Sequence, residues 1–190
     1  GGMWVEADCN LISGESMVRQ LLYGKIFFKK EFGIDVDNLW LPDVFGYSAA
    51  LPQILKLAEI DYFLTQKISW NQFNEFPFQT FNWRGIDGTE ILTHFPPENT
   101  YNSELDTKFI MPAQETFKEK DKLNEFMSLF GVGDGGGGPK PENIEMGKRI
   151  NNLEGAPKVS FDTAKNFFKR LNKSKSILET WVGELYLELH

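Results

Sequence analysis

Four polar side chains follow apolar segments that have the character of buried strands. Asp43 follows "NLWLP", Lys67 follows "DYFLTQ", Tyr101 comes a few residues after "EILTHF", and Asp134 follows "SLFGVG". In β/α barrels and open α/β sheets, ligands bind at the carboxyl ends of the strands, where the loops converge. Two carboxylates at such an edge suit glycoside hydrolysis, in which one attacks or stabilises the anomeric carbon and the other transfers a proton. The pattern fits an enzyme, but many enzymes share it.

Both carboxylates also have an ordinary interpretation. An aspartate that follows a strand, as Asp43 does, often caps the next helix by accepting hydrogen bonds from its first backbone N–H groups. Asp134 stands in "GVGDGGGGPK", and glycine clusters are frequently only surface turns. That run lacks the Gly-Lys-Ser/Thr ending of a phosphate-binding loop, which argues against nucleotide binding.

The first half of the chain alternates helical spacing with short apolar runs. Apolar residues recur at helical spacing between Ser16 and Phe32, and Gly33 supplies a stop signal, so this stretch is predicted to be a helix. The elements predicted after it are a strand at 38–41, a helix at 49–58 with Pro52 in its first turn, and a strand at 61–66.

The second half continues the alternation. The segments "FQTFNWRG" and "EILTHF" flank the turn-forming residues 86–88, so they either pair as a hairpin or lie as neighbouring strands. The elements predicted after them are loop and helix within 104–125, a strand at 126–133, a polar helix ending at Asn152, a helix from about Asp162 to Leu171, and an apolar segment at 181–189. The order predicts an α/β fold built of β/α units.

Composition limits the classes of partner. The 190 residues are 41% hydrophobic and 14% aromatic, which is enough for a packed core. A net charge of −7 argues against nucleic acid or an anionic membrane as the main partner, and no apolar run approaches the roughly 20 residues that span a bilayer. Cys9 is the single cysteine, so an intramolecular disulfide is excluded. Small or neutral ligands remain.

Five blocks of the sequence carry a more specific signal. "WLPDVFGYSAALPQI", "DYFLTQKISWNQFN", "ILTHFPPENTYNS", "LFGVGDGGGGP" and "WVGELYLELH" resemble, in this order, the α-mannosidases of glycoside hydrolase family 38, in particular their cytosolic and vacuolar branch. The resemblance implies a zinc-dependent retaining enzyme whose N-terminal catalytic domain is a distorted β/α barrel. Residues 1–190 would then be an incomplete part of that barrel. They would function together with the rest of their own chain and act on a mannose-containing oligosaccharide.

The resemblance also assigns roles to individual residues. It makes Asp43 the catalytic nucleophile and a zinc ligand, since one carboxylate oxygen can hold the metal while the other attacks the sugar. Asp134 becomes the candidate acid/base, although many relatives have a second aspartate where this chain has Gly135. Lys67 would lie near the nucleophile and Tyr101 would touch the substrate.

The aromatic residues near Asp43 and the two histidines have two kinds of expected role, in the pocket or in the core. Phe45 and Tyr47 either wall the sugar pocket or belong to the core, and Phe45 is the candidate substrate-binding residue of the two. Neither histidine, His94 nor His190, has a partner at metal-ligand spacing, and His94 is expected to be a hydrogen-bonded structural residue.

The remaining zinc ligands are expected outside this segment, as a His-x-Asp pair upstream and a histidine well downstream. The segment alone is therefore expected to be inactive, and either poorly soluble or prone to associate. The resemblance implies a cytoplasmic protein, with the vacuole or lysosome as the alternative. Two rival functions stay open, namely an inactive carbohydrate-binding segment and a related metal-dependent barrel hydrolase or deacetylase.

Overall fold

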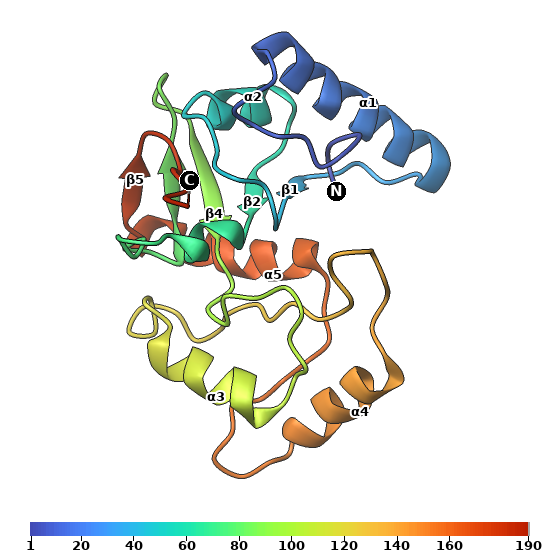
Figure 1. Ribbon diagram of the computed structural model, residues 1–190, viewed down its shortest axis with the longest axis vertical. Helices are drawn as coiled ribbons and strands as arrows, with labels where there is room; N and C mark the ends of the chain where they lie inside the picture. Colours follow the sequence, from blue (N-terminus) through green and yellow to red (C-terminus); the bar gives the residue numbers. More distant parts are fainter. Residues whose placement is uncertain (190) are drawn as a thin grey trace.

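The computed structural model describes residues 1–189, and its centre is one mixed five-stranded sheet (Figure 1). The strand order is β1-β2-β4-β3-β5. The strands are β1 (Asn38–Trp40), β2 (Tyr62–Leu64), β3 (Thr80–Arg84), β4 (Glu90–His94) and β5 (Thr180–Val182). β1, β2 and β4 run parallel, β3 pairs antiparallel with β4, and β5 runs parallel to β3. The α/β class is thus confirmed.

Helices cover both faces of this sheet, because side chains alternate along each strand. Leu39 and Phe63 belong to the core on the face that packs against α1 (Gly14–Phe32) and α2 (Leu51–Leu57). Leu64 and Leu92 belong to a second core on the opposite face, with the apolar side of α5 (Ala164–Leu171). There, the ring of Tyr62 stacks on Phe168 with 5.1 Å between centroids.

Local signals set the ends of the longest helix. The hydroxyl of Ser13 accepts a hydrogen bond from the Ser16 backbone N–H at 3.2 Å, which satisfies one of the free donors at the start of α1. Gly33 closes the helix at φ 68°, a left-handed conformation that glycine adopts without strain. The stop signal at Gly33 is confirmed, while the helix begins two residues earlier than predicted.

A second group of elements lies beyond α5 in Figure 1, on the side away from α1 and α2. It contains α3 (Thr107–Thr116) and α4 (Pro141–Ile150), and α5 (Ala164–Leu171) separates it from the sheet. Two short 3₁₀ helices complete the structure, η1 (Lys67–Trp70) and η2 (Asn172–Ile177). Among residues 1–189, none of the helices combines the length and the apolar character required to cross a bilayer.

Two predicted features differ from the structure. Residues 126–133 are not a strand, because their backbone groups bond outside a ladder. The Met127 N–H donates to His94 Nε2 at 3.2 Å, the Leu129 carbonyl accepts from the Ser103 N–H at 2.9 Å, and Val132 forms an isolated bridge with Gly137. Within residues 1–189 the strands form an open sheet with β1 and β5 at its edges, so the barrel is not confirmed.

Two further predictions concern the turn at residues 86–88 and the apolar segment at 181–189. The segments around residues 86–88 form a hairpin, in which Thr80 pairs with His94 and Arg84 with Glu90. The apolar segment 181–189 contributes only the end of β5 to the sheet, and beyond it Leu185 forms an isolated antiparallel bridge with Tyr47.

Candidate active site

Sheet register places Asp43 beside Lys67. Trp40 of β1 pairs with Leu64 of the parallel strand β2, and Asp43 and Lys67 are each the third residue beyond that pair. The carbonyl of Pro42 accepts hydrogen bonds from the Lys67 N–H at 3.0 Å and from the preceding N–H at 3.2 Å. The two loops therefore leave the sheet edge tied together, with both polar side chains on the same side.

An ion pair joins these side chains. Lys67 Nζ contacts Asp43 Oδ1, and the lysine side chain is 3% exposed while the aspartate side chain is 35% exposed. The Asp43 backbone N–H donates to Glu6 Oε1 at 3.1 Å. The helix α2 begins only at Leu51 with Ala50 at its N-cap, so Asp43 does not cap that helix. The carboxylate is half-exposed and held through one of its two oxygens.

Two aromatic rings surround the Lys67 ammonium group. Its nitrogen lies 3.4 Å from the ring centroid of Trp70 and 4.7 Å from that of Phe45. In a 3₁₀ helix, side chains three positions apart lie over one another, which explains why Trp70 covers Lys67 within η1. Gly46 turns the chain directly after Phe45 at φ 100°. The cation–π contacts stabilise a buried charge that water does not reach.

Tyr101 lies between the two candidate catalytic carboxylates. Its hydroxyl donates to Asp134 Oδ1 at 3.2 Å. Burial first, then the charge of Asp43 and the hydrogen bond and charge of Asp134, raise the pKa of Tyr101 to about 12, and a weaker hydrogen bond to Asp43 adds to the shift. Tyr101 therefore stays protonated and donates its proton to the hydrogen bond with Asp134.

Tyr101 brings Asp134 near the ion pair of Asp43 and Lys67. Its hydroxyl bonds to Asp134, and the charge of Asp43 is close enough to raise the pKa of Tyr101. Asp134 itself is exposed, at φ 54°, at the start of the glycine run.

Close packing joins the Tyr101 loop to the segment that leads to Asp134. The Gly133 N–H donates to Asn102 Oδ1 at 2.6 Å. A Cβ atom at Gly133 would lie 2.3 Å from Cε2 of Tyr101, a contact that real structures do not contain. Glycine is required at position 133 so that the Tyr101 ring can lie against the backbone.

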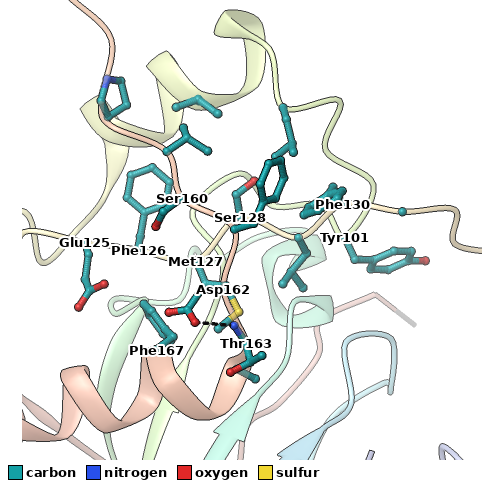
Figure 2. A pocket seen from close by; sticks show the side chains of 18 of the residues that line it. Tyr101, Glu125, Phe126, Met127, Ser128, Phe130, Ser160, Asp162, Thr163 and Phe167 are labelled. Carbon is teal, nitrogen blue, oxygen red and sulfur yellow. Dashed lines mark hydrogen bonds between the residues drawn. The ribbon is translucent and has the colours of Figure 1, made fainter. Parts of the chain in front are cut away.

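A cavity of about 700 Å³ opens next to this cluster, and Pro42, Tyr101 and Gly133 line it. Figure 2 shows Tyr101 at one end, with its hydroxyl directed away from Glu125 and Phe126 at the other end. Asp43, Lys67 and Asp134 do not line the cavity. Tyr101 thus both lines the cavity and contacts Asp134.

Two other candidate residues are structural. Tyr47 is 1% exposed, and its hydroxyl donates to the Leu41 carbonyl at 2.7 Å, so it belongs to the core rather than to a sugar pocket. His94 is fully buried, and its Nε2 accepts from the Met127 N–H. Nδ1 must then carry the proton, and it donates a hydrogen bond to Thr80 Oγ1 at 2.9 Å. His94 is a structural residue, as expected, while His190 lies outside the described residues.

The described residues do not make a zinc site by themselves. Within residues 1–189, no three histidine, cysteine, aspartate or glutamate side chains lie where they could hold one metal ion. Structural and catalytic zinc sites take three or four protein ligands. Asp43 has one oxygen on Lys67, and Glu6 already accepts from the Asp43 backbone.

Comparison with protein families gives one decisive match. Residues 1–184 match the N-terminal domain of the glycosyl hydrolases family 38. The chain belongs to this family. The fold agrees, since an Enterococcus faecalis V583 α-mannosidase structure superposes with a TM-score of 0.76 at 21% identity, covering 97% of this chain and 22% of that one.

The relatives of this family 38 chain are α-mannosidases. It is 53% identical to α-mannosidase G of Dictyostelium discoideum, 47% identical to human α-mannosidase 2C1 and 46% identical to an α-mannosidase of Saccharomyces cerevisiae. Each alignment covers the whole chain but only 18% of the relative's length. The chain thus spans about a fifth of the curated relatives that it matches.

Sequence reasoning did not identify several residues that shape the site. The position of Trp70 could be inferred from the sequence, because it stands three positions after Lys67, which is one turn of a 3₁₀ helix. Asn102 and Gly133 have none, since their contact joins two loops 31 residues apart. Sequence periodicity does not encode such a contact.

Proposed function

We propose that this chain provides part of the catalytic site of a retaining α-mannosidase that removes terminal α-linked mannose from oligosaccharides. One observation carries the proposal, namely that the Tyr101 hydroxyl donates to Asp134 while the charge of Asp43 acts on the same hydroxyl. Family membership and the α-mannosidase relatives support the substrate class. Retention at the anomeric carbon would require the two carboxyl groups to lie roughly 5–5.5 Å apart.

The two carboxylates divide the proposed reaction. The free oxygen of Asp43 attacks the anomeric carbon while the bond to the leaving oxygen breaks and Asp134 gives that oxygen a proton. In the second step Asp134 takes a proton from water, and the hydroxide displaces Asp43 from the sugar. The Lys67 ammonium contacts Asp43 and orients it, and Phe45 and Trp70 offer apolar faces for a pyranose ring.

The proposal includes a zinc ion that this segment would bind only in part. Asp43 is the side chain here that would bind the metal, and the other ligands would come from outside residues 1–189. When bound, the ion would act as a Lewis acid toward sugar hydroxyls. The segment alone would then lack a complete site, so we expect it to be inactive without the remaining part of the protein.

Substitution in the full-length protein tests the assignment. Asp43→Asn should lower kcat on an aryl α-mannoside by at least about 10³-fold, because the amide is not a nucleophile. Asp134→Asn should spare kcat/KM on activated substrates and lower it on substrates with poor leaving groups, while kcat on activated substrates falls because the second step loses its base. Asp121→Asn is the matched control, since Asp121 is exposed and outside the site, and should leave the rates unchanged.

The other outcomes identify the rival functions. Equal rates for wild type and Asp43→Asn would contradict the nucleophile assignment. Ligand binding without turnover would indicate a carbohydrate-binding segment. Acetate released from an acetylated sugar, with no mannose released from mannosides, would indicate a deacetylase.

A further inference from the structure

Residues 96–103, called here the Tyr101 loop, are held on both sides by side-chain hydrogen bonds. On the Lys67 side, Gln66 is 1% exposed, and its Nε2 donates to the Asn99 carbonyl at 2.7 Å. Asn99 has φ 54°, so this loop turns sharply at the residue that Gln66 holds. The loop is thereby fixed relative to β2 and the ion pair that follows it.

On the Asp134 side, Glu98 joins the loop to the following segment. Its Oε2 accepts from the Ser128 hydroxyl at 2.6 Å, and its Oε1 accepts from the Ser103 hydroxyl at 3.2 Å. The Ser103 N–H also donates to the Leu129 carbonyl at 2.9 Å. One carboxylate therefore connects the Tyr101 loop with the stretch that reaches Asp134 six residues after Ser128.

Glu98 occupies an unfavourable place for an acid. Burial raises the pKa of Glu98, while the hydrogen bonds from Ser128 and Ser103 oppose that rise. No ion pair to Glu98 is found among residues 1–189, so the two hydroxyls stabilise its charge. A side chain in this place forms a cross-link at some cost in solvation. The position of Glu98 between the two segments suits a role in positioning Tyr101 and Asp134, which these segments carry.

We propose that Glu98 is a positioning residue that sets Asp134 relative to Asp43 by fixing the Tyr101 loop to the segment before Asp134. This inference rests on the proposed function. Glu98 does not touch the carboxylates or a substrate in this account. It acts through Ser103 and Ser128, which fix the two segments whose side chains meet at the Tyr101 hydroxyl.

Leaving-group dependence distinguishes positioning from general destabilisation. An acid in the right place matters most when the departing oxygen is strongly basic, as in a disaccharide, and little when it is an activated phenol. Loss of folded protein lowers both rates equally. A misplaced Asp134 lowers only the rate that needs its proton.

The test compares variants of the full-length protein on dinitrophenyl α-mannoside and on an α-linked mannobiose. For Glu98→Ala, kcat/KM should fall about 10-fold or more on mannobiose and at most about 3-fold on the activated substrate. Glu98→Gln should stay within about 3-fold on both, because its amide accepts from one hydroxyl and donates to the other. Glu104→Ala is the matched control, since Glu104 is exposed and nearby in sequence.

Ser128→Ala keeps the inference testable if Glu98→Ala does not fold. It removes the 2.6 Å hydrogen bond and should give the same selective loss on mannobiose. An equal loss on both substrates, or no loss on either, would overturn the positioning role while the proposed function stands. A wild-type protein that releases mannose from neither substrate would overturn the proposed function and this inference with it.

Discussion

The two sides of the candidate site are built in different ways. On one side, Asp43 and Lys67 follow paired parallel strands, and the lysine is buried against Trp70. On the other side, Asp134 is exposed in a glycine-rich loop without a regular strand before it. Sheet register fixes the first carboxylate, whereas side-chain cross-links between loops fix the second.

This difference in rigidity matches the role that each carboxylate has in the proposed reaction. A nucleophile must meet one carbon atom in one orientation, and the sheet edge supplies that precision. An acid/base must serve a departing oxygen and then a water molecule, and a loop held by hydrogen bonds supplies a defined but less rigid position. Substitutions on the sheet side should therefore lower kcat/KM on every substrate. Substitutions on the loop side should lower kcat/KM mainly on substrates with poor leaving groups.

The largest effect is expected on the sheet side. Lys67→Met should lower kcat/KM about 100-fold on activated and unactivated mannosides alike, because Asp43 loses its charged partner. Lys108→Met is the control, since Lys108 is exposed on α3 and should not affect the rate. Steady-state kinetics on both substrates make the comparison. A loss confined to mannobiose would contradict the distinction between the sides.

A smaller effect is expected from crowding on the loop side. Gly133→Ala places a methyl group 2.3 Å from the Tyr101 ring, and relieving such contacts costs about 1–3 kcal/mol. We expect roughly a 10-fold loss on mannobiose, in kcat/KM, with less on the activated substrate. Gly138→Ala is the matched control, because no atom lies within 4 Å of a Cβ placed there. If both alanine variants behave alike, the close packing of Tyr101 has no functional role.

The ring over Lys67 should contribute less than the ion pair. Trp70→Leu keeps an apolar cover but removes the cation–π contact, worth about 1 kcal/mol or roughly fivefold in kcat/KM. Trp70→Phe keeps an aromatic face and should lose less. The order wild type, Phe, Leu in kcat/KM supports the assignment, and equal rates for Phe and Leu would argue against it.

The smallest effect concerns the free energy of unfolding. It comes from His94 in β4, away from the two carboxylates. Burial lowers the pKa of His94 to about 3 from an ordinary value of 6.5, so the unfolded state binds the proton first as the pH falls. Stability is therefore present above pH 6.5 and is lost progressively between pH 6.5 and 3, by about 1 kcal/mol from pH 7.5 to 5.5.

Thermal unfolding of wild type and His94→Gln at these two pH values measures this contribution. The variant should be less stable at pH 7.5 but should lose less stability on acidification. Activity at neutral pH should change little in any folded variant, because His94 touches neither carboxylate. An identical pH dependence in both proteins would show that His94 is protonated alike in the folded and unfolded states.

Local signals predicted the sheet side well. Short apolar strands, the stop at Gly33 and the hairpin turn before β4 each depend on a few adjacent residues, and parallel pairing then brings Asp43 and Lys67 together. Lys67 was expected near Asp43, but its burial under Trp70 was not, because that follows from the 3₁₀ geometry of η1.

The loop side was beyond local prediction. Residues 126–133 have the apolar character of a strand, yet their backbone bonds to His94, Ser103 and Gly137. Apolar composition indicates burial but does not say which partner accepts each N–H. The cross-link through Glu98 joins serines 25 positions apart, so only the folded chain reveals it.

The central claim is that Asp43 forms the covalent bond to mannose. Full-length protein treated with a fluorinated mannosyl fluoride that slows release of the intermediate, then digested and mapped by mass spectrometry, tests it directly. We predict one added sugar on Asp43, and none in Asp43→Asn. A sugar attached to any other residue, or turnover without a covalent intermediate, would contradict the account.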